Sequence, residues 1–282
     1  MSNAEKYLLL ARRGQILRRP VYLNIPIVEH CNLNCRGCFH FSPIAEPWCM
    51  EPEDLRQDLA LLRDVPEVET FLRGLMIYGG EPLLHPALEE IMDLVRGAFP
   101  GQGVNCAIMT NGLLLSRMPE SFWEKCRTLA VGISLSPYPI GLDYDALRRE
   151  IEARGVTASL NITSDGDRFT RAVLDPTGSR DGELMHLKCP AIGGSNCFQL
   201  RDGRIYPCHR IACAHILNRR FGTDFRIGPG DWLELREIRG AEDVYRLRME
   251  PFPFCRYCDV DSYSEVEWGV SEGKPEEWMN IC

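Results

Sequence analysis

Between residues 21 and 163 the sequence alternates short apolar runs with segments of helical periodicity, and this pattern limits the fold more than any other feature. Strands are predicted over Val21–Ile27, Leu72–Tyr78, Val104–Met109, Val131–Leu135 and Val156–Ile162, with Phe169–Leu174 as a candidate sixth. Strands that alternate with helices form right-handed βαβ units, which build a parallel sheet. We therefore expect an α/β fold with an open or partial barrel.

The helices are predicted from apolar residues at helical spacing. In Glu53–Arg63, the side chains of Leu55, Leu59 and Leu62 share one face, and Pro52 favours a helix start. Further helices are expected over Pro86–Ala98 and Glu120–Leu129, and around Tyr144–Ile151.

The regular alternation ends near residue 185. Beyond it, Asp202-Gly203 separates Phe198–Leu200 from Arg204–Tyr206, and Asp-Gly between short strands predicts a hairpin. We therefore expect two domains: a partial barrel over residues 1–185 and a smaller unit over residues 186–282.

Cysteine is unusually frequent, with 13 in 282 residues. The number is odd and no secretory signal peptide is evident, so a disulfide framework is not expected, and reduced thiols are available to bind metal. The net charge of -8 argues against nucleic acid as the main partner. No apolar run is long enough to span a membrane. We expect a cytoplasmic metalloprotein.

The first cysteine motif is Cys31-x3-Cys35-x2-Cys38, directly after the first predicted strand. Three thiolates on one short loop suit three irons of a 4Fe–4S cube and leave the fourth iron open. A zinc knuckle or a set of core thiols is the alternative interpretation. The motif resembles the cluster loop of the radical S-adenosylmethionine (SAM) superfamily. It departs from that family at Gly37, where an aromatic residue is usual; Phe39 could take that role.

The resemblance implies a partial (β/α)6 barrel whose open iron binds SAM. The reduced cluster would cleave SAM to a 5′-deoxyadenosyl radical, which abstracts hydrogen from a substrate. An electron donor such as flavodoxin or ferredoxin is also implied.

A second motif, Tyr78-Gly79-Gly80-Glu81-Pro82, follows the second predicted strand and resembles the segment that binds the amino group of SAM in this superfamily. Alone, it would be read as a turn before a helix. Polar residues at or near the ends of later strands resemble positions that line the SAM pocket: Asn111, Ser134 and Asn161.

The later cysteines resemble a SPASM-type auxiliary cluster signature. Cys189 precedes Gly203 by 13 intervening residues, Cys208 follows after four more, and Cys255 and Cys258 form a C-x2-C pair. The pattern matches the shortened form, a twitch-like iron–sulfur domain with one auxiliary 4Fe–4S cluster. A four-cysteine zinc site is the alternative. Cys197 and Cys213 are left unassigned as possible replacement ligands, whereas Cys49, Cys106 and Cys126 are expected in the core.

The combination of the two motifs implies an oxidoreductase, and the size and cysteine layout resemble the aminocyclitol dehydrogenase of butirosin biosynthesis. We expect a small polar substrate such as a sugar or cyclitol. The alternatives are maturation of a ribosomally made peptide, activation of a glycyl-radical enzyme and a non-catalytic metal-binding module. No motif selects a general base; Arg148, Asp165 and Arg210 are candidates.

Overall fold

The structure is a computed structural model, and it describes residues 19–101, 103–161, 168–191, 197–247 and 249–281. Its centre is an eight-stranded sheet in the order β5-β4-β3-β2-β1-β7-β8-β9. The strands are β1 (Val21–Val28), β2 (Leu72–Gly79), β3 (Asn105–Thr110), β4 (Val131–Leu135), β5 (Ala158–Leu160), β7 (Cys197–Arg201), β8 (Arg204–Tyr206) and β9 (Leu233–Glu234). The first five strands and β7 run parallel, as the βαβ pattern predicts.

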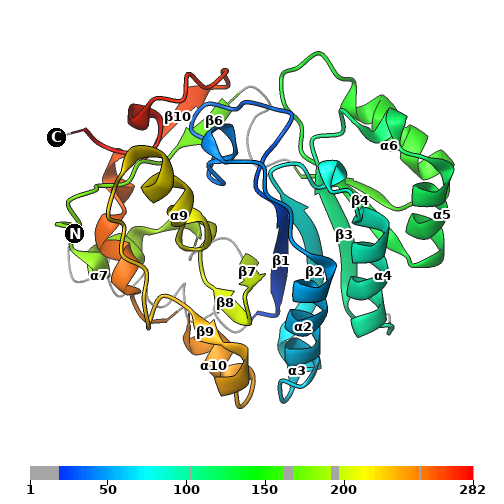
Figure 1. Cartoon of the computed structure of the whole chain (residues 1–282), viewed down its shortest axis with the longest axis horizontal. Coiled ribbons are helices and arrows are strands. Elements are labelled where there is room, and N and C mark those ends of the chain that lie inside the picture. Colours follow the sequence, from blue (N-terminus) through cyan, green and yellow to red (C-terminus); the bar gives the residue numbers. More distant parts are fainter. Residues whose placement is uncertain (1–18, 102, 162–167, 192–196, 248, 282) are drawn as a thin grey trace.

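Helices cover the outer face of the curved sheet (Figure 1). They are α2 (Pro52–Arg63), α3 (Val68–Phe71), α4 (Leu88–Ala98), α5 (Glu120–Thr128) and α6 (Tyr144–Ala153). The predicted face of α2 is buried as expected, with Leu55 and Leu62 fully inside. Burial of such side chains stabilises the fold by about 1.5–3 kcal/mol each. The main core lies between these helices and the alternate strand residues that point toward them.

The prediction for Phe169–Leu174 is wrong. This region begins in β6 (Arg168–Arg171), which pairs antiparallel with β10 (Ser264–Glu267) in a separate two-stranded sheet. The sixth parallel strand is β7, which lies on the other side of β1. A strand that pairs with a segment almost 100 residues later leaves no local sequence signal, because strand propensity does not specify a partner.

The hairpin prediction is confirmed, since β7 and β8 pair antiparallel around Asp202 and Gly203. Both turn residues have positive φ, 56° and 71°, as a two-residue hairpin of this type requires. Because β7 also pairs with β1, the strands β7, β8 and β9 continue the barrel sheet. The division at residue 185 therefore does not coincide with a break in the sheet, and it stays a prediction.

The C-terminal part packs against the β1 and β7 side of the sheet (Figure 1). It contains α7 (Gly182–Lys188), α9 (His209–Phe221), α10 (Ala241–Arg246) and the 3-10 helix η5 (Pro253–Tyr257). Of these, α9 and η5 contribute to a second hydrophobic cluster that includes Phe254, Tyr257 and Trp278, whereas Val244 of α10 belongs to the main core. No helix in the described parts of the chain is both long and apolar enough to cross a bilayer.

Candidate active site with two groups of cysteines

The loop trio (Cys31, Cys35 and Cys38) lies at the carboxyl end of β1 and lines one small cavity of about 60 Å³. Burial raises the pKa of Cys31 to about 12 and that of Cys35 to about 11, so these thiols hold their protons until a metal displaces them. Tyr78, Gly79, Gly80 and Asn111 line the same cavity. The structure thus brings the first cysteine motif and most of the predicted SAM residues together.

Gly79 and Gly80 allow the end of β2 to lie against the backbone that leads into the cysteine loop. A Cβ at Gly79 would lie 2.2 Å from the carbonyl oxygen of Val28, and one at Gly80 would lie 2.0 Å from that of His30. Both contacts are impossibly short, so only glycine fits at either position. The two glycines therefore serve the protein's own backbone, and a close approach to SAM stays a prediction.

Glu81 is 1% exposed and its carboxylate accepts three hydrogen bonds from the protein. The donors are the Leu83 amide at 3.1 Å, the Thr110 hydroxyl at 2.7 Å and the Asn111 amide at 3.0 Å. Burial raises the pKa of Glu81, although these hydrogen bonds oppose the shift. The geometry makes Glu81 a link between the ends of β2 and β3, and contact with the SAM amino group stays a prediction.

The other predicted SAM residues, Asn111, Asn161 and Ser134, differ in their position relative to the cysteine cavity. Asn111 Nδ2 is 3.8 Å from the Cys31 sulfur and donates to Asn32 at 2.7 Å. Asn161 directs its amide toward the Met109 sulfur at 3.7 Å, and Met109 lines the cysteine cavity. Ser134 instead lines a larger cavity.

The cysteine cavity also includes residues that the sequence interpretation missed: His40, Met109, Ser136 and Tyr138. Ser136 and Tyr138 directly follow β4. Since functional groups gather where parallel strands end, their position offered a signal that could have found them.

A segment near the C-terminus covers the cysteine loop. The Trp268 indole N–H donates to the Cys35 sulfur at 3.2 Å, and the Trp278 indole donates to the Cys38 carbonyl oxygen at 2.9 Å. The Arg36 amide also donates to the Gly269 carbonyl oxygen at 2.8 Å. More than 230 residues separate these partners in the chain, so no local pattern could reveal them.

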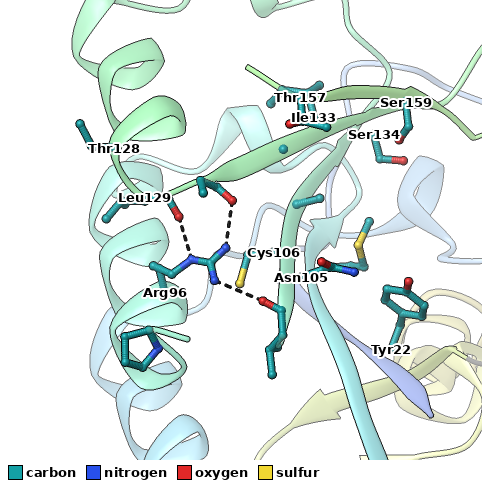
Figure 2. Close-up of a pocket in the computed structure, with 16 residues that line it drawn as sticks. Tyr22, Arg96, Asn105, Cys106, Thr128, Leu129, Ile133, Ser134, Thr157 and Ser159 are labelled. Carbon is teal, nitrogen blue, oxygen red and sulfur yellow. Dashed lines mark hydrogen bonds between the residues drawn. The ribbon is translucent and has the colours of Figure 1, made fainter. Parts of the chain in front are cut away.

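The larger cavity has a volume of about 790 Å³ and is lined by residues of β1 to β5 and of the turns that precede β3, β4 and β5 (Figure 2). Its polar lining includes Tyr22, Asn105, Ser134 and Ser159. Arg96 is the one charged side chain among its described lining residues. The guanidinium donates to the carbonyl oxygens of Leu129, Ala130 and Val104 at 2.7, 2.9 and 3.2 Å (Figure 2). These hydrogen bonds pair the Arg96 guanidinium with backbone carbonyl groups of the protein.

The C-terminal quartet (Cys189, Cys208, Cys255 and Cys258) forms a second group of thiols. Cys189 ends α7, Cys208 precedes α9, and Cys255 and Cys258 lie in and after η5. Burial raises the pKa of Cys258 to about 12; Arg210 opposes this shift, whereas Cys208 and Cys189 add to it. Cys258, Cys208 and Cys189 likewise act on the Cys255 thiol. Three segments, around Cys189, Cys208 and Cys255–Cys258, therefore converge on one place.

The unassigned cysteines lie outside this quartet. Cys213 is buried within α9, and the charges acting on its thiol are, in falling order, Arg201, Glu29, Cys38 and Cys208. Cys197 pairs with Tyr22 across β7 and β1. Cys106 and Cys126 belong to the main core as expected, and Cys49 is partly buried against it.

Among the described residues, no three His, Cys, Asp or Glu side chains are placed to hold a single metal ion. A cubane cluster offers a different iron to each thiolate, so its ligands are spread more widely than those of one ion. A loop of three thiols beside a polar cavity fits a cluster with one open iron, and a quartet of thiols fits a closed one.

The candidate bases do not gather at the site. Arg148 lies on α6 and pairs with Asp145 and Glu152 at the surface. Asp165 is outside the described residues. Arg210 is buried beside the C-terminal quartet.

The fold and the site define a class: a parallel partial barrel with a cysteine loop after its first strand, built to hold iron and sulfur. The chain belongs to the radical SAM superfamily, whose model matches residues 25–179, more than half of the sequence. Membership supports a 4Fe–4S cluster and SAM as cofactors.

Curated relatives include GTP 3′,8-cyclases. The protein from Microcystis aeruginosa is 28% identical over 265 residues, which cover 90% of this chain and 66% of the relative. The protein from Moorella thermoacetica is 28% identical over 249 residues, covering 82% of this chain and 65% of the relative. The chain thus spans just under two thirds of the length of these relatives.

Among solved structures, BtrN in complex with AdoMet and 2-DOIA superposes with a TM-score of 0.51 at 14% identity. The match covers 92% of this chain and 97% of BtrN. At this identity the likeness shows the fold, and it extends over nearly the whole of both chains.

Proposed function

We propose that this protein cleaves SAM reductively and uses the 5′-deoxyadenosyl radical to oxidise a small polar substrate, with a second 4Fe–4S cluster as electron acceptor. One observation carries the proposal. The C-terminal quartet converges from three segments, separately from the loop trio, and so offers a closed second set of ligands.

In this proposal the loop trio holds the first cluster. When bound, that cluster supplies one electron to the sulfonium of SAM, which gives methionine and the 5′-deoxyadenosyl radical. SAM would bind against the side of the trio formed by Tyr78, Gly79, Gly80 and Asn111, while Glu81 fixes the ends of β2 and β3 there. Ser134 and Asn161 would lie toward the ribose and the substrate.

The oxidation balances with one electron entering and one leaving. The radical would take a hydrogen atom from a carbinol carbon of the substrate and become 5′-deoxyadenosine. Loss of the hydroxyl proton and of one further electron would then give a carbonyl group. A cluster on the quartet would accept that electron, since four thiolate ligands leave no iron open for another role.

We propose residues 186–282 as a twitch-like domain that carries this second cluster. Its strands β7, β8 and β9 continue the barrel sheet, and its quartet forms beside the second hydrophobic cluster. The fold shared with BtrN over almost the full length is compatible with this assignment, and binding of AdoMet by BtrN supports SAM here.

The larger cavity does not select the substrate, because much of its lining comes from the amino ends of β1, β3, β4 and β5, whereas the loop trio lies at the carboxyl end of β1. The proposal of a small polar substrate therefore rests on the cysteine layout and on the quartet.

A second candidate activity is a cyclisation of GTP, which the named activity of the curated relatives favours. The two candidates differ in the substrate that enhances SAM cleavage. Incubation of the reconstituted protein with GTP or with polyols, followed by mass analysis of 5′-deoxyadenosine and of the product, separates them.

The first test is anaerobic reconstitution followed by measurement of iron, sulfide and zinc. We expect about eight irons per chain, and about four after Cys31, Cys35 and Cys38 are all replaced by Ala. That variant should also lose SAM cleavage. About four irons together with one zinc in the unchanged protein would make the quartet a structural zinc site and would remove the electron acceptor.

A further inference from the structure

Arg210 is a buried arginine that has no acidic partner among the residues the structure describes. It lies in the first turn of α9, two residues after Cys208, and is 4% exposed. Its Nη1 donates to the Tyr263 hydroxyl and lies 3.9 Å from the Cys258 sulfur. Within the described parts of the chain, its Nε has no hydrogen-bond partner and no carboxylate balances its charge.

The groups that can supply negative charge to Arg210 are Tyr263 and three cysteines of the C-terminal quartet. An uncompensated buried guanidinium is strongly unfavourable. A 4Fe–4S cluster bound by four thiolates has a net negative charge and would compensate Arg210 fully.

The arginine also lies between the two groups of cysteines. Its guanidinium carbon is 5.6 Å from the ring centroid of Phe39, the residue after Cys38, and 5.0 Å from that of Tyr263. The adjacent His209 stacks on Phe39 with centroids 5.4 Å apart. The start of α9 thus connects the cysteine loop with the quartet. The positive end of its 13-residue helix dipole adds to the charge of Arg210.

We propose that Arg210 is a positioning residue that raises the reduction potential of the cluster on the C-terminal quartet, so that this cluster accepts an electron from the oxidised substrate. The inference rests on the second cluster of the proposed function. Reduction adds one negative charge to the cluster. A fixed positive charge nearby therefore stabilises the reduced form more than the oxidised form.

The experiment uses the full chain with Cys31, Cys35 and Cys38 replaced by Ala, so that only the second cluster remains. Its reduction potential is measured by a redox titration followed by electron paramagnetic resonance. In this background, Arg210→Gln should reduce the equilibrium constant for one-electron reduction at least tenfold, which is about 59 mV toward negative potential. Arg210→Lys keeps the charge and should stay near the parent.

Arg219→Gln is the matched control because it makes the same change on the same helix. Arg219 is exposed and pairs with Glu46 at the surface, so the potential should not move. An iron-loaded Arg210→Gln variant with the parent's potential would refute the role of Arg210. Zinc, or no metal, in the parent would instead refute the second cluster itself.

Thermal unfolding of the metal-free protein gives an independent test, which works even where Arg210→Gln loads iron poorly. Removal of an uncompensated buried charge should leave the unfolding temperature of the metal-free Arg210→Gln protein equal to that of the parent or higher. A lower unfolding temperature would show that Arg210 has a structural role without any cluster, and would overturn the inference.

Discussion

Asp58 is a carboxyl group on α2 that is buried with few donors around it. It is 5% exposed, and its Oδ1 accepts a hydrogen bond from the Gly203 amide at 2.6 Å. Burial raises the pKa of Asp58 to about 6, and the nearby charges of Asp202 and Asp54 raise it further against the backbone hydrogen bonds. The folded protein therefore retains a proton there that the unfolded chain, with a pKa near 3.8, has already lost.

Because folding raises the pKa of Asp58, the ionised form of this side chain is predicted to destabilise the fold. Its destabilising effect is fully present above about pH 6, weakens as the pH falls from about 6 toward 4, and is absent below about pH 4. Asp58→Asn keeps an acceptor for Gly203 and removes the charge. In urea unfolding of the metal-free protein, it should raise the unfolding free energy by up to about 3 kcal/mol near pH 7.5. Near pH 4 the gain should vanish.

Asp64→Asn is the control, since Asp64 is an exposed carboxylate at the end of the same helix. An equal gain from Asp58→Asn at both pH values would contradict the ionisation argument.

The ends of β2 and β3 show how two strands cooperate in building the site. The Thr110 hydroxyl, at the end of β3, donates to Glu81 and accepts the Gly112 amide at 3.1 Å. Tyr144 on α6 adds a hydrogen bond to the Asn111 carbonyl oxygen at 3.0 Å. The segments that follow β2 and β3 are thus held by groups from different elements. Loss of one of these hydrogen bonds should therefore disturb both segments.

Thr110→Val tests this link, because it keeps the shape of the side chain and removes the hydroxyl. Glu81 then lacks one donor while buried, so the unfolding free energy should fall by about 1–3 kcal/mol. Binding of SAM should weaken at the same time, as measured by calorimetry on the reconstituted protein. Thr128→Val removes an exposed hydroxyl that bonds to its own helix and should change neither value by more than about 0.5 kcal/mol.

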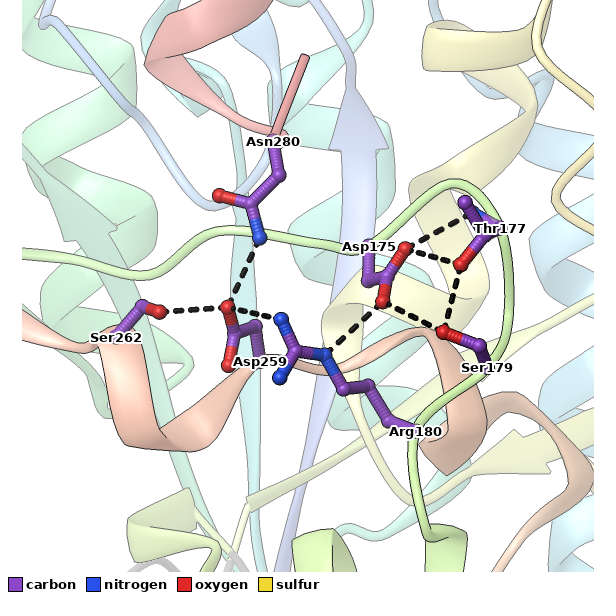
Figure 3. Close-up of polar contacts among 7 residues, drawn as sticks. All are labelled: Asp175, Thr177, Ser179, Arg180, Asp259, Ser262 and Asn280. Carbon is purple, nitrogen blue, oxygen red and sulfur yellow. Dashed lines mark hydrogen bonds and ion pairs between the residues drawn. The ribbon is translucent and has the colours of Figure 1, made fainter. Parts of the chain in front are cut away.

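At the scale of the whole molecule, the segment between the barrel and the quartet is held by one arginine (Figure 3). Arg180 donates to Asp175 at 2.9 Å and to Asp259 at 2.8 Å. Asp259 directly follows Cys258 and also accepts from Ser262 and from Asn280 (Figure 3). The network thus joins the segment that contains Asp175 and Arg180, the turn that contains Cys255 and Cys258, and Asn280 near the end of the chain.

Arg180→Gln should release that connection. The buried carboxylate of Asp259 loses its ion pair, and because Arg180 is itself partly exposed the cost should be about 1–3 kcal/mol of unfolding free energy. Iron bound to the quartet should also become easier to remove with a chelator. Arg226→Gln breaks an exposed pair with Asp224 and should leave chelation unchanged. Equal chelation rates in both variants would show that the network does not support the quartet.

The sequence by itself determined the local order of elements. Five parallel strands, the α2 helix and the Asp202-Gly203 hairpin were readable, because side-chain periodicity and turn chemistry act within a few residues. The radical SAM superfamily was also readable, since its cysteine loop and glycine motif are short and contiguous. The large division of the chain at residue 185 remains a prediction.

Tertiary structure alone decided which distant segments meet. It placed β7 beside β1, paired β6 with β10 and brought Trp268 to the Cys35 sulfur. It also turned Glu81 inward and set Arg210 among the quartet thiols. These contacts depend on packing and on the need of each buried polar group for a partner, which operate between residues far apart in the chain. A local pattern cannot contain them.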